Sequence, residues 1–571
     1  MSISTDRGES ALTFGRSRAE LAALASIASL AALVLALSWN RWLEPIIDLG
    51  RDLYIPEAMV EGARLYDDIL YFYPPLTPSI LALVVSVFGS SLAVYTAIGI
   101  ATALAAATAL YALVRATAGW PAAAAVAVMF VSMHLAGTST WGANFIFPYA
   151  HAATFGMTFF LIFAASLARH LFVRPTAVSA WAAVAFGLLS AAAKIEYILA
   201  VGVVMLVAVV VYRLPIRYLA ALAAASIAAF GALWVIFRGS EPGHHWLFDN
   251  VLASSLLTSE SASLFYSRVS GMAMARERIG PILISALIVA SVVALLAIAD
   301  RARRRGARVS AALSVLGALA GTALLLHQWR LFASWPLILL ALVPFAARER
   351  SRSPLAFLLA ASLGTAVRIF LAIGPGWYGF VLVLPTYALI AYLFATWLPG
   401  RRAYRIELAI VWLLLALAIS GLGIHDSMSR WAARSVEVVT ARGTYLDDPL
   451  RGEAIGSLLE WLRTRPSEET LVVLPEGLAI NYFAARRTPL SFYTFTPIEI
   501  DDPATEQRII GEVRQRRPDL IVVVPRDVRE FGYRGLGVDY ARELARVIER
   551  DYRLVWRSAS RYPVFALERA D

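Results

Sequence analysis

Long apolar runs alternate with short polar segments along most of the chain. Each run is about 20 residues long, the length an α-helix needs to cross a bilayer core. The pattern therefore predicts a polytopic α-helical membrane protein with about thirteen transmembrane helices. We expect the spans near 21–43, 91–114, 120–138, 150–172, 177–195, 196–212, 217–238, 280–299, 309–326, 331–347, 354–373, 378–397 and 406–424.

The placement of arginine is an independent guide to topology, because cytoplasmic loops are enriched in basic residues. If the N-terminus is cytoplasmic, every second loop should be basic. The loops concerned hold Arg115; Arg169 and Arg174; Arg213 and Arg217; Arg301, Arg303, Arg304, Arg305 and Arg308; Arg348, Arg350 and Arg352; and Arg401, Arg402 and Arg405. The intervening loops are poor in arginine, apart from 239–279. An odd number of spans then places the C-terminal region outside.

Three segments share the outer face in this topology: loop 44–90, loop 239–279 and the tail 425–571. Within the first loop, 74–89 is apolar but too short to span, so we expect a helix lying in or dipping into the interface. The chain thus divides into a transmembrane domain, 1–424, and a soluble extracytoplasmic domain, 425–571.

The tail has a different pattern from the rest of the chain. Short β-rich runs at 471–474 and 520–524 each end at a proline, and helical patterns occur at about 451–464, 503–517 and 538–549. Alternating strands and helices indicate a small α/β domain with a partly parallel sheet.

Composition narrows the class of protein. The 571 residues are 59% hydrophobic and 16% charged, whereas soluble domains are about 45–50% apolar and about 25% charged. This composition argues against a large soluble enzyme. The net charge is +10, and the basic residues lie beside the apolar spans. This placement suits arginines that set membrane topology better than a surface that binds nucleic acid. There is no cysteine, which excludes disulfides, thiolate metal sites and a cysteine nucleophile.

Carboxylates cluster directly after the first span. Loop 44–68 contains Glu44, Asp48, Asp52, Glu57, Glu61, Asp67 and Asp68, and no acidic residue follows until Glu196. Most of these are expected to be ordinary solvated loop residues. Asp48 differs because apolar residues precede and follow it. A carboxylate partly desolvated at the membrane surface can act as a general base toward an acceptor hydroxyl or amine.

Lys194 is the only lysine in a chain otherwise rich in arginine. It lies between two apolar spans, at the predicted outer boundary, where ionisable residues are costly and are functional candidates. Its ammonium could bind a lipid-linked phosphate. Alternatively, it forms an ion pair with Glu196 or snorkels at a helix end.

Other outer-face candidates are individually weaker. Arg51, Arg330 and Arg368 could grip phosphate oxygens through two nitrogens. His151, near Asn144 and Tyr149, is more typical of a hydrogen-bonded interfacial histidine than of a catalyst. The phosphate-cradling, nucleophile-elbow and zinc-protease motifs are absent, which disfavours a nucleotide-driven pump. If the protein uses a donor substrate, that substrate should therefore be carried by a lipid and be reachable from the outer face.

Several segments, in their order along the chain, resemble GT-C class glycosyltransferases. Residues 47–56, 61–69 and 73–78 are similar to the first outer loop of the aminoarabinose transferases and of bacterial relatives of the protein O-mannosyltransferases. Residues 144–149, 187–196, 376–380 and 474–483 continue the resemblance. In that class an aspartate of the first outer loop is catalytic, and the matching position is Asp48.

The resemblance implies transfer of a sugar from a polyprenyl-phosphate donor to a lipid, glycan or protein acceptor. The reaction would take place at the outer face of a bacterial inner membrane, with inversion at the anomeric carbon. Asp48 would be the general base, and Lys194, Arg51 and Arg330 would bind the donor phosphate. We expect the substrate pocket to include Tyr54, Asn144, Tyr149, His151 and Glu196.

The chain also departs from the family pattern. Aminoarabinose transferases have Asp-Glu at the first-loop site, whereas Leu49 follows Asp48 here. No acidic residue lies between Ser139 and His151, where many GT-C enzymes carry one. This favours a metal-independent mechanism, with a divalent cation not excluded. Two alternatives stay open: a transporter or flippase of lipid-linked sugars, which would need polar residues through its spans, and a non-catalytic envelope assembly protein.

Overall fold

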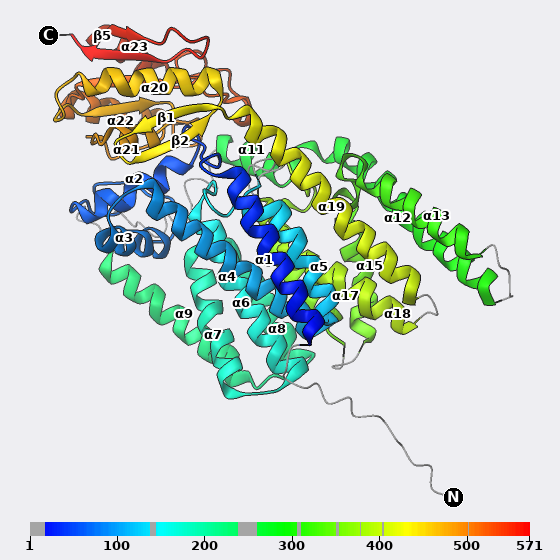
Figure 1. Ribbon diagram of the computed structural model, residues 1–571. Helices are drawn as coiled ribbons and strands as arrows, with labels where there is room; N and C mark the ends of the chain where they lie inside the picture. The colour runs from blue at the N-terminus through cyan, green and yellow to red at the C-terminus, as the bar shows by residue number, and fades with distance from the viewer. Residues whose placement is uncertain are drawn as a thin grey trace, which may run out of the picture.

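Apolar helices build the membrane part, and every predicted span coincides with helical structure (Figure 1). The computed structural model describes residues 17–137, 144–237, 260–304, 310–349, 353–376, 379–401, 405–500 and 502–570. The helices of this part are α1 (Arg18–Ser38), α4 (Leu92–Ala118), α5 (Trp120–Phe130), α6 (His151–Ala168), α7 (Ala177–Ala193), α8 (Glu196–Val210), α9 (Ile216–Ile236), α12 (Ala275–Arg304), α13 (Ser310–Leu326), α14 (Arg330–Ala333), α15 (Trp335–Arg348), α16 (Leu355–Ala366), α17 (Leu384–Tyr392), α18 (Leu398–Arg401) and α19 (Arg405–Ala433).

Length and hydropathy make this chain a multi-pass membrane protein. Within the described residues, seven helices are long and apolar enough to cross a membrane. They are Arg18–Ser38, Leu92–Ala118, His151–Val173, Ile216–Ile236, Met272–Leu295, Phe380–Gly400 and Leu408–Ala433. Shorter apolar helices account for most of the other predicted spans, and a total of thirteen crossings stays a prediction.

The predicted cytoplasmic segments meet at one end of the helix bundle. Arg115, at the end of α4, pairs with Glu20 of α1 at 2.7 Å. Tyr212 donates from its hydroxyl to the carbonyl of Ser353 at 2.6 Å. The predicted outer loops and the C-terminal tail lie at the opposite end (Figure 1). This arrangement agrees with the alternation inferred from arginine placement.

Loop 44–90 contains two helices, α2 (Leu49–Val60) and α3 (Leu76–Phe88). The short helix predicted in 74–89 is therefore present, and Leu83, Val87 and Phe88 are exposed on it. An apolar helix with exposed large side chains beside a membrane bundle suits the interfacial position expected from sequence.

The tail contains a four-stranded mixed sheet in the order β3-β4-β6-β5. Strand β3 (Leu471–Leu474) pairs in parallel with β4 (Leu520–Val523), as the sequence predicts. β6 (Phe565–Arg569) pairs antiparallel with both β4 and β5 (Tyr552–Arg557), and β1 (Val436–Thr440) and β2 (Gly443–Asp447) form a separate hairpin. The tail helices are α20 (Pro449–Arg463), α21 (Ala479–Ala484), α22 (Pro503–Arg516) and α23 (Arg542–Asp551).

Helix α11 (Glu260–Val269) is the first described element of loop 239–279, whose residues 239–259 lie outside the described chain. The helix connects the membrane part to the tail. The ring of Phe265 stacks on Phe531 with centroids 5.2 Å apart, and Arg268 donates to the carbonyl of Glu530 at 2.8 Å.

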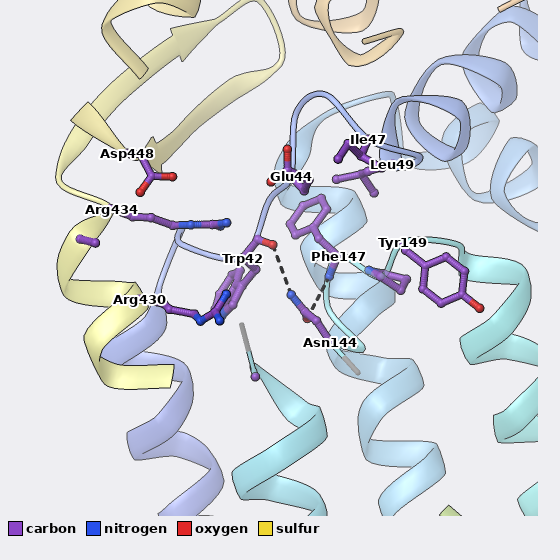
Figure 2. Close-up of a pocket in the computed structure, with 13 residues that line it drawn as sticks. Trp42, Glu44, Ile47, Leu49, Asn144, Phe147, Tyr149, Arg430, Arg434 and Asp448 are labelled. Carbon is purple, nitrogen blue, oxygen red and sulfur yellow. Dashed lines mark hydrogen bonds between the residues drawn. The ribbon is translucent and has the colours of Figure 1, made fainter. Parts of the chain in front are cut away.

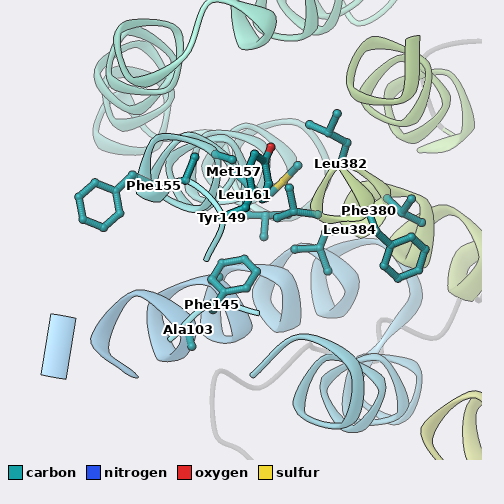
Figure 3. Packing of buried hydrophobic residues seen from close by; sticks show 14 of the residues in the cluster. Ala103, Phe145, Tyr149, Phe155, Met157, Leu161, Phe380, Leu382 and Leu384 are labelled. Atoms are coloured by element: carbon teal, nitrogen blue, oxygen red, sulfur yellow. The ribbon is translucent and has the colours of Figure 1, made fainter. Parts of the chain in front are cut away.

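Beneath the outer loops, aromatic and aliphatic side chains form a tightly packed core. Figure 3 shows Phe145 and Tyr149 packed among α4, α6 and the segment that leads into α17. Because packed interiors resist deformation, this core provides a rigid support for the outer loops.

Candidate active site

Asp48 lies at the N-terminal end of α2 in an unusual backbone conformation. Its φ and ψ are 58° and −50°, a combination that costs a non-glycine residue about 1–3 kcal/mol. The Asp48 N–H donates to the Oε1 of Glu476, in the tail, at 2.7 Å. The tail therefore holds the backbone of the candidate base directly.

Arg51 is held beside Asp48 by contacts from all three of its guanidinium nitrogens. It contacts Asp48 Oδ1 and Asp52 Oδ1 at 3.3 Å each, and it donates to the carbonyl of Tyr149 at 3.1 Å. Its carbon Cζ lies 4.7 Å from the centre of the Tyr73 ring. Burial alone would lower the Arg51 pKa, but Tyr73 and the two aspartates raise it well above its usual value. Arg51 is thus a permanent, oriented positive charge.

Asp52 helps to hold the guanidinium of Arg51 in place. It is almost fully buried and bonds to the backbone N–H and the Nδ1 of His151, the latter at 3.1 Å. Burial raises the Asp52 pKa, yet Arg51 and His151 outweigh burial and the net shift is downward. Asp52 therefore stays ionised and anchors Arg51, while His151 points away from solvent.

Lys194 lies at the end of α7 and is 2% exposed. It donates to the hydroxyl of Tyr149 at 3.1 Å and pairs with Glu196 Oε1 at 3.3 Å. Glu196 also pairs with Arg368. The Lys194–Glu196 pair considered from sequence is thus real. It does not remove the lysine from the site, because both residues line the central cavity.

One cavity of about 1290 Å³ joins these groups. Asp48, Arg51, Lys194, Glu196 and Arg368 line it from the membrane part. Tail residues complete the wall, among them Glu476, Tyr493, Glu499, Arg526 and Phe531. The cavity therefore lies at the junction of the bundle and the tail, and neither part forms it alone.

Two carboxyl groups of the tail face this cavity, the buried Glu476 and the half-buried Glu499. Glu476 accepts from Arg526 Nε at 2.7 Å as well as from Asp48. Burial raises the pKa of Glu476 to about 6, with Arg526 acting in the opposite direction. Burial likewise raises the pKa of Glu499 to about 7, opposed by its hydrogen bond from Thr496.

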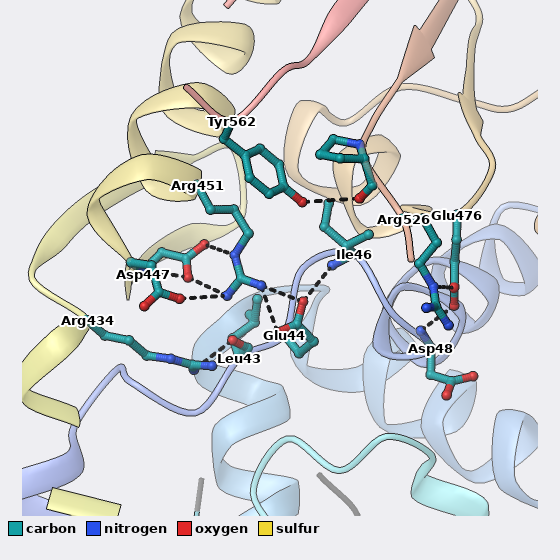
Figure 4. A network of polar contacts seen from close by, with 12 residues as sticks. Leu43, Glu44, Ile46, Asp48, Arg434, Asp447, Arg451, Glu476, Arg526 and Tyr562 are labelled. Carbon is teal, nitrogen blue, oxygen red and sulfur yellow. Dashed lines mark hydrogen bonds and ion pairs between the residues drawn. The ribbon is translucent and has the colours of Figure 1, made fainter. Parts of the chain in front are cut away.

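Polar contacts fasten the tail to the loop that carries Asp48 (Figure 4). Arg451 of α20 donates to both carboxylate oxygens of Glu44 at 2.8 Å and is itself held by Asp447. Arg434 donates to the carbonyls of Arg41 and Leu43 at 2.7 and 2.9 Å. These contacts hold the loop on the N-terminal side of Asp48.

The remaining sequence-predicted residues lie outside this cavity. Asn144 and Tyr149 line a smaller pocket of about 160 Å³ under Trp42, where Asn144 donates to the Trp42 carbonyl at 3.2 Å (Figure 2). The hydroxyl of Tyr54 accepts from the N–H of Thr488 at 3.0 Å, joining α2 to the tail. Arg330 is the first residue of α14 and does not line the cavity. Of the three proposed phosphate ligands, the structure therefore brings together Lys194 and Arg51.

Sequence reasoning missed the contributions of Tyr73, Asp52, Glu476, Glu499 and Arg526. Asp52, Tyr73 and Glu476 lie in segments that resemble GT-C enzymes, but the resemblance did not distinguish these residues from their neighbours in the sequence. The three tail residues are more than 400 positions from Asp48, and no local pattern links them. Within the described residues, no three His, Asp or Glu side chains form a group suited to a metal ion.

The sequence matches no family model and no curated protein. Several solved structures match over nearly the whole chain, among them the following three. ArnT from Cupriavidus metallidurans bound to undecaprenyl phosphate is 14% identical with a TM-score of 0.47, covering 95% of this chain and 97% of that one. The Archaeoglobus fulgidus oligosaccharyltransferase complex with zinc and sulfate is 14% identical with a TM-score of 0.49, covering 95% and 73%. AglB from Archaeoglobus fulgidus, in complex with an inhibitory peptide and a dolichol-phosphate, is 13% identical with a TM-score of 0.49, covering 97% and 75%.

These structures are glycosyltransferases of the class that the sequence resembles. The likeness is loose, with TM-scores below 0.5, and it assigns no substrate or residue role to this chain.

Proposed function

We propose that this protein transfers a sugar from a polyprenyl-phosphate donor to an acceptor at the outer face of the membrane. The observation that carries the proposal is the shared cavity. Asp48 and Arg51 come from the start of α2 and Lys194 from the end of α7, and all three line one space at the end of the bundle that carries the predicted outer loops.

Lys194 and Arg51 are the groups we assign to the donor phosphate. The bond that breaks joins the anomeric carbon to the phosphate oxygen, and negative charge develops on the departing polyprenyl phosphate. Fixed positive charges at that point lower the barrier without reorganising during the reaction. Arg51 is held by Asp52 and by the Tyr149 carbonyl, so it is already in place before the donor binds.

Asp48 is the group we assign to the acceptor. Its side chain is 19% exposed and it lines the cavity. The acceptor oxygen or nitrogen attacks the anomeric carbon, the phosphate departs from the opposite face, and Asp48 takes the acceptor's proton. A single displacement of this kind inverts the anomeric centre. It needs no metal-bound nucleophile, and a divalent cation on the donor phosphate is compatible with it.

The test is transfer of radiolabelled sugar from polyprenyl-phosphate donors by purified wild-type protein in nanodiscs, scored with membrane lipids and periplasmic glycans as acceptors. We expect Asp48→Asn to lower kcat by about 10²–10⁴-fold, the usual contribution of a general base. Lys194→Met should lower it by about 10²-fold, as loss of one charge-stabilising group does, and Lys194→Arg should restore part of it.

Asp68→Asn is the matched control, because Asp68 is in the same loop, is 46% exposed and does not line the cavity. It should leave the rate unchanged. A folded Asp48→Asn protein with full activity would remove Asp48 from the mechanism. Movement of intact donor across the bilayer, with no transfer under any condition, would favour the transporter instead.

A further inference from the structure

The central cavity is larger than one donor headgroup requires. Its volume of about 1290 Å³ exceeds the range of about 300–1,000 Å³ that suits a single small molecule. If the donor phosphate binds at Lys194, space remains toward the tail. The chemistry of that second wall then indicates what occupies it.

The most informative residue of the tail wall is Glu499. Its Oε2 accepts from the backbone N–H of Thr496 at 3.1 Å and from the hydroxyl of the same residue. Within the described residues, no arginine, lysine or histidine forms an ion pair with it. Its neighbour Glu476, by contrast, is paired with Arg526. Glu499 is therefore a carboxyl group that faces a cavity without a protein cation to balance it.

Aromatic side chains also line the cavity that Glu499 faces. Tyr493, Phe265 and Phe531 line the same cavity, and the two phenylalanines stack on each other. Aromatic faces attract cations, and desolvated sites strengthen that attraction. A carboxyl group in a cavity that is also lined by aromatic rings suits a protonated amine better than a phosphate or a carboxylate.

The two walls thus differ in charge preference. On the membrane wall, Arg51, Lys194 and Arg368 accompany Asp48 and Glu196. On the tail wall, Glu476, Glu499, Asp527 and Glu530 outnumber Arg451 and Arg526. Asp48 connects them, since its carboxylate contacts Arg51 and its N–H contacts Glu476. An anionic donor phosphate is attracted to the membrane wall and repelled by the tail wall. The two walls therefore favour two different ligands, one on either side of Asp48.

We infer that the tail wall is the acceptor site and that the acceptor carries a protonated primary amine, which binds Glu499. This inference rests on the proposed function and deepens it. The raised pKa of Glu499 is consistent with it, because a carboxyl group held in a desolvated site without a cation should have a raised pKa. The amine is an anchor here, and the nucleophile is the acceptor group placed next to Asp48.

The experiment is a saturation-transfer NMR titration of the full-length protein in nanodiscs, without donor. Two probes carry the amine on different carriers: glucosamine represents a glycan, and ethanolamine a lipid headgroup. Their N-acetylated forms are the uncharged controls. We expect at least one amine to bind about tenfold or more tightly than its N-acetylated form, and Glu499→Gln to abolish that preference. Glutamine keeps an oxygen for Thr496, so folding should be retained.

Asp48→Asn should keep the amine preference, because Asp48 is not the anchor. Equal binding of amine and N-acetylated probes, or a preference that survives Glu499→Gln, would overturn the inference. Displacement of the amine by millimolar Ca²⁺ or Mg²⁺ only in wild type would reassign Glu499 to a metal site. Amine binding at Glu499 in a protein that transfers no sugar would refute the proposed function and leave the binding site intact.

Discussion

At the scale of single residues, the backbone of Asp48 is the most telling feature of the site. Its positive φ is retained although an L-residue pays for it in free energy. The compensating contact comes from Glu476, whose carboxylate accepts the Asp48 N–H and is fixed in turn by Arg526. We therefore regard Glu476 as a positioning residue for the candidate base.

Substitution of Glu476 tests this role. Glu476→Ala removes the acceptor for the Asp48 N–H, so we expect kcat to fall by about 10–100-fold, the usual effect of a misplaced catalytic group. Glu476→Gln keeps an oxygen acceptor and should retain more activity than the alanine variant. The donor KM should change little, because Lys194 and Arg51 are untouched.

The kcat and KM values, normalised to folded protein, distinguish positioning from a loss of stability. A purely structural role would lower the folded fraction and leave kcat per folded molecule as in wild type. Glu453→Ala, at an exposed position on α20, is the control.

At the scale of elements, the tail is attached to the loop after α1 by a few strong contacts. Arg451 of α20 bridges Glu44 and Asp447. Close backbone packing adds to this, since a Cβ on Gly50 would lie 2.2 Å from the backbone nitrogen of Ala479. The start of α2 and the start of α21 therefore approach more closely than any side chain would allow.

The Arg451–Glu44 pair gives a measurable coupling. We expect Arg451→Met and Glu44→Gln each to destabilise the tail, and the double variant to lose less than the sum of the two. A coupling energy of about 1–3 kcal/mol is typical for residues in one partly buried network. The measurement is thermal unfolding of the tail, followed by near-UV circular dichroism in detergent. Strictly additive effects would show that the contact contributes nothing to docking.

The elements also show how far the sequence could be read. The predicted strand 471–474 is confirmed, and the strand predicted at 520–524 is present as Leu520–Val523. Both are continuous apolar runs, and all their residues except Val523 are buried. β5 and β6 were missed because polar residues such as Arg553, Arg557 and Glu568 interrupt them. Those residues are tolerated since one face of the sheet is only partly buried. Of the candidate site, the sequence predicted the membrane side: Asp48, Arg51, Lys194 and Glu196 all line the cavity. The tail residues of the cavity were not predicted, because they meet the outer loop only through long-range contacts that a local sequence pattern does not reveal.

At the scale of the whole molecule, the proposal requires the cavity end of the bundle to face outward. The absence of cysteine makes this simple to examine with single introduced cysteines. Arg529→Cys, at a position 80% exposed on the tail, should react with an impermeant maleimide on intact spheroplasts. Arg174→Cys, at the other end of the bundle, should react only after permeabilisation. The reverse pattern would place the cavity in the cytoplasm, away from the proposed donor.

The order in which the cavity wall is encoded has a consequence for biosynthesis. Asp48 is synthesised before Glu476, Glu499 and Arg526, which follow it by more than 400 residues. A nascent chain whose spans are already inserted still lacks the wall that fixes the Asp48 backbone. Catalytic competence would therefore arise only after these tail residues have been made, so that chains with inserted spans but no tail would not consume the lipid-linked donor.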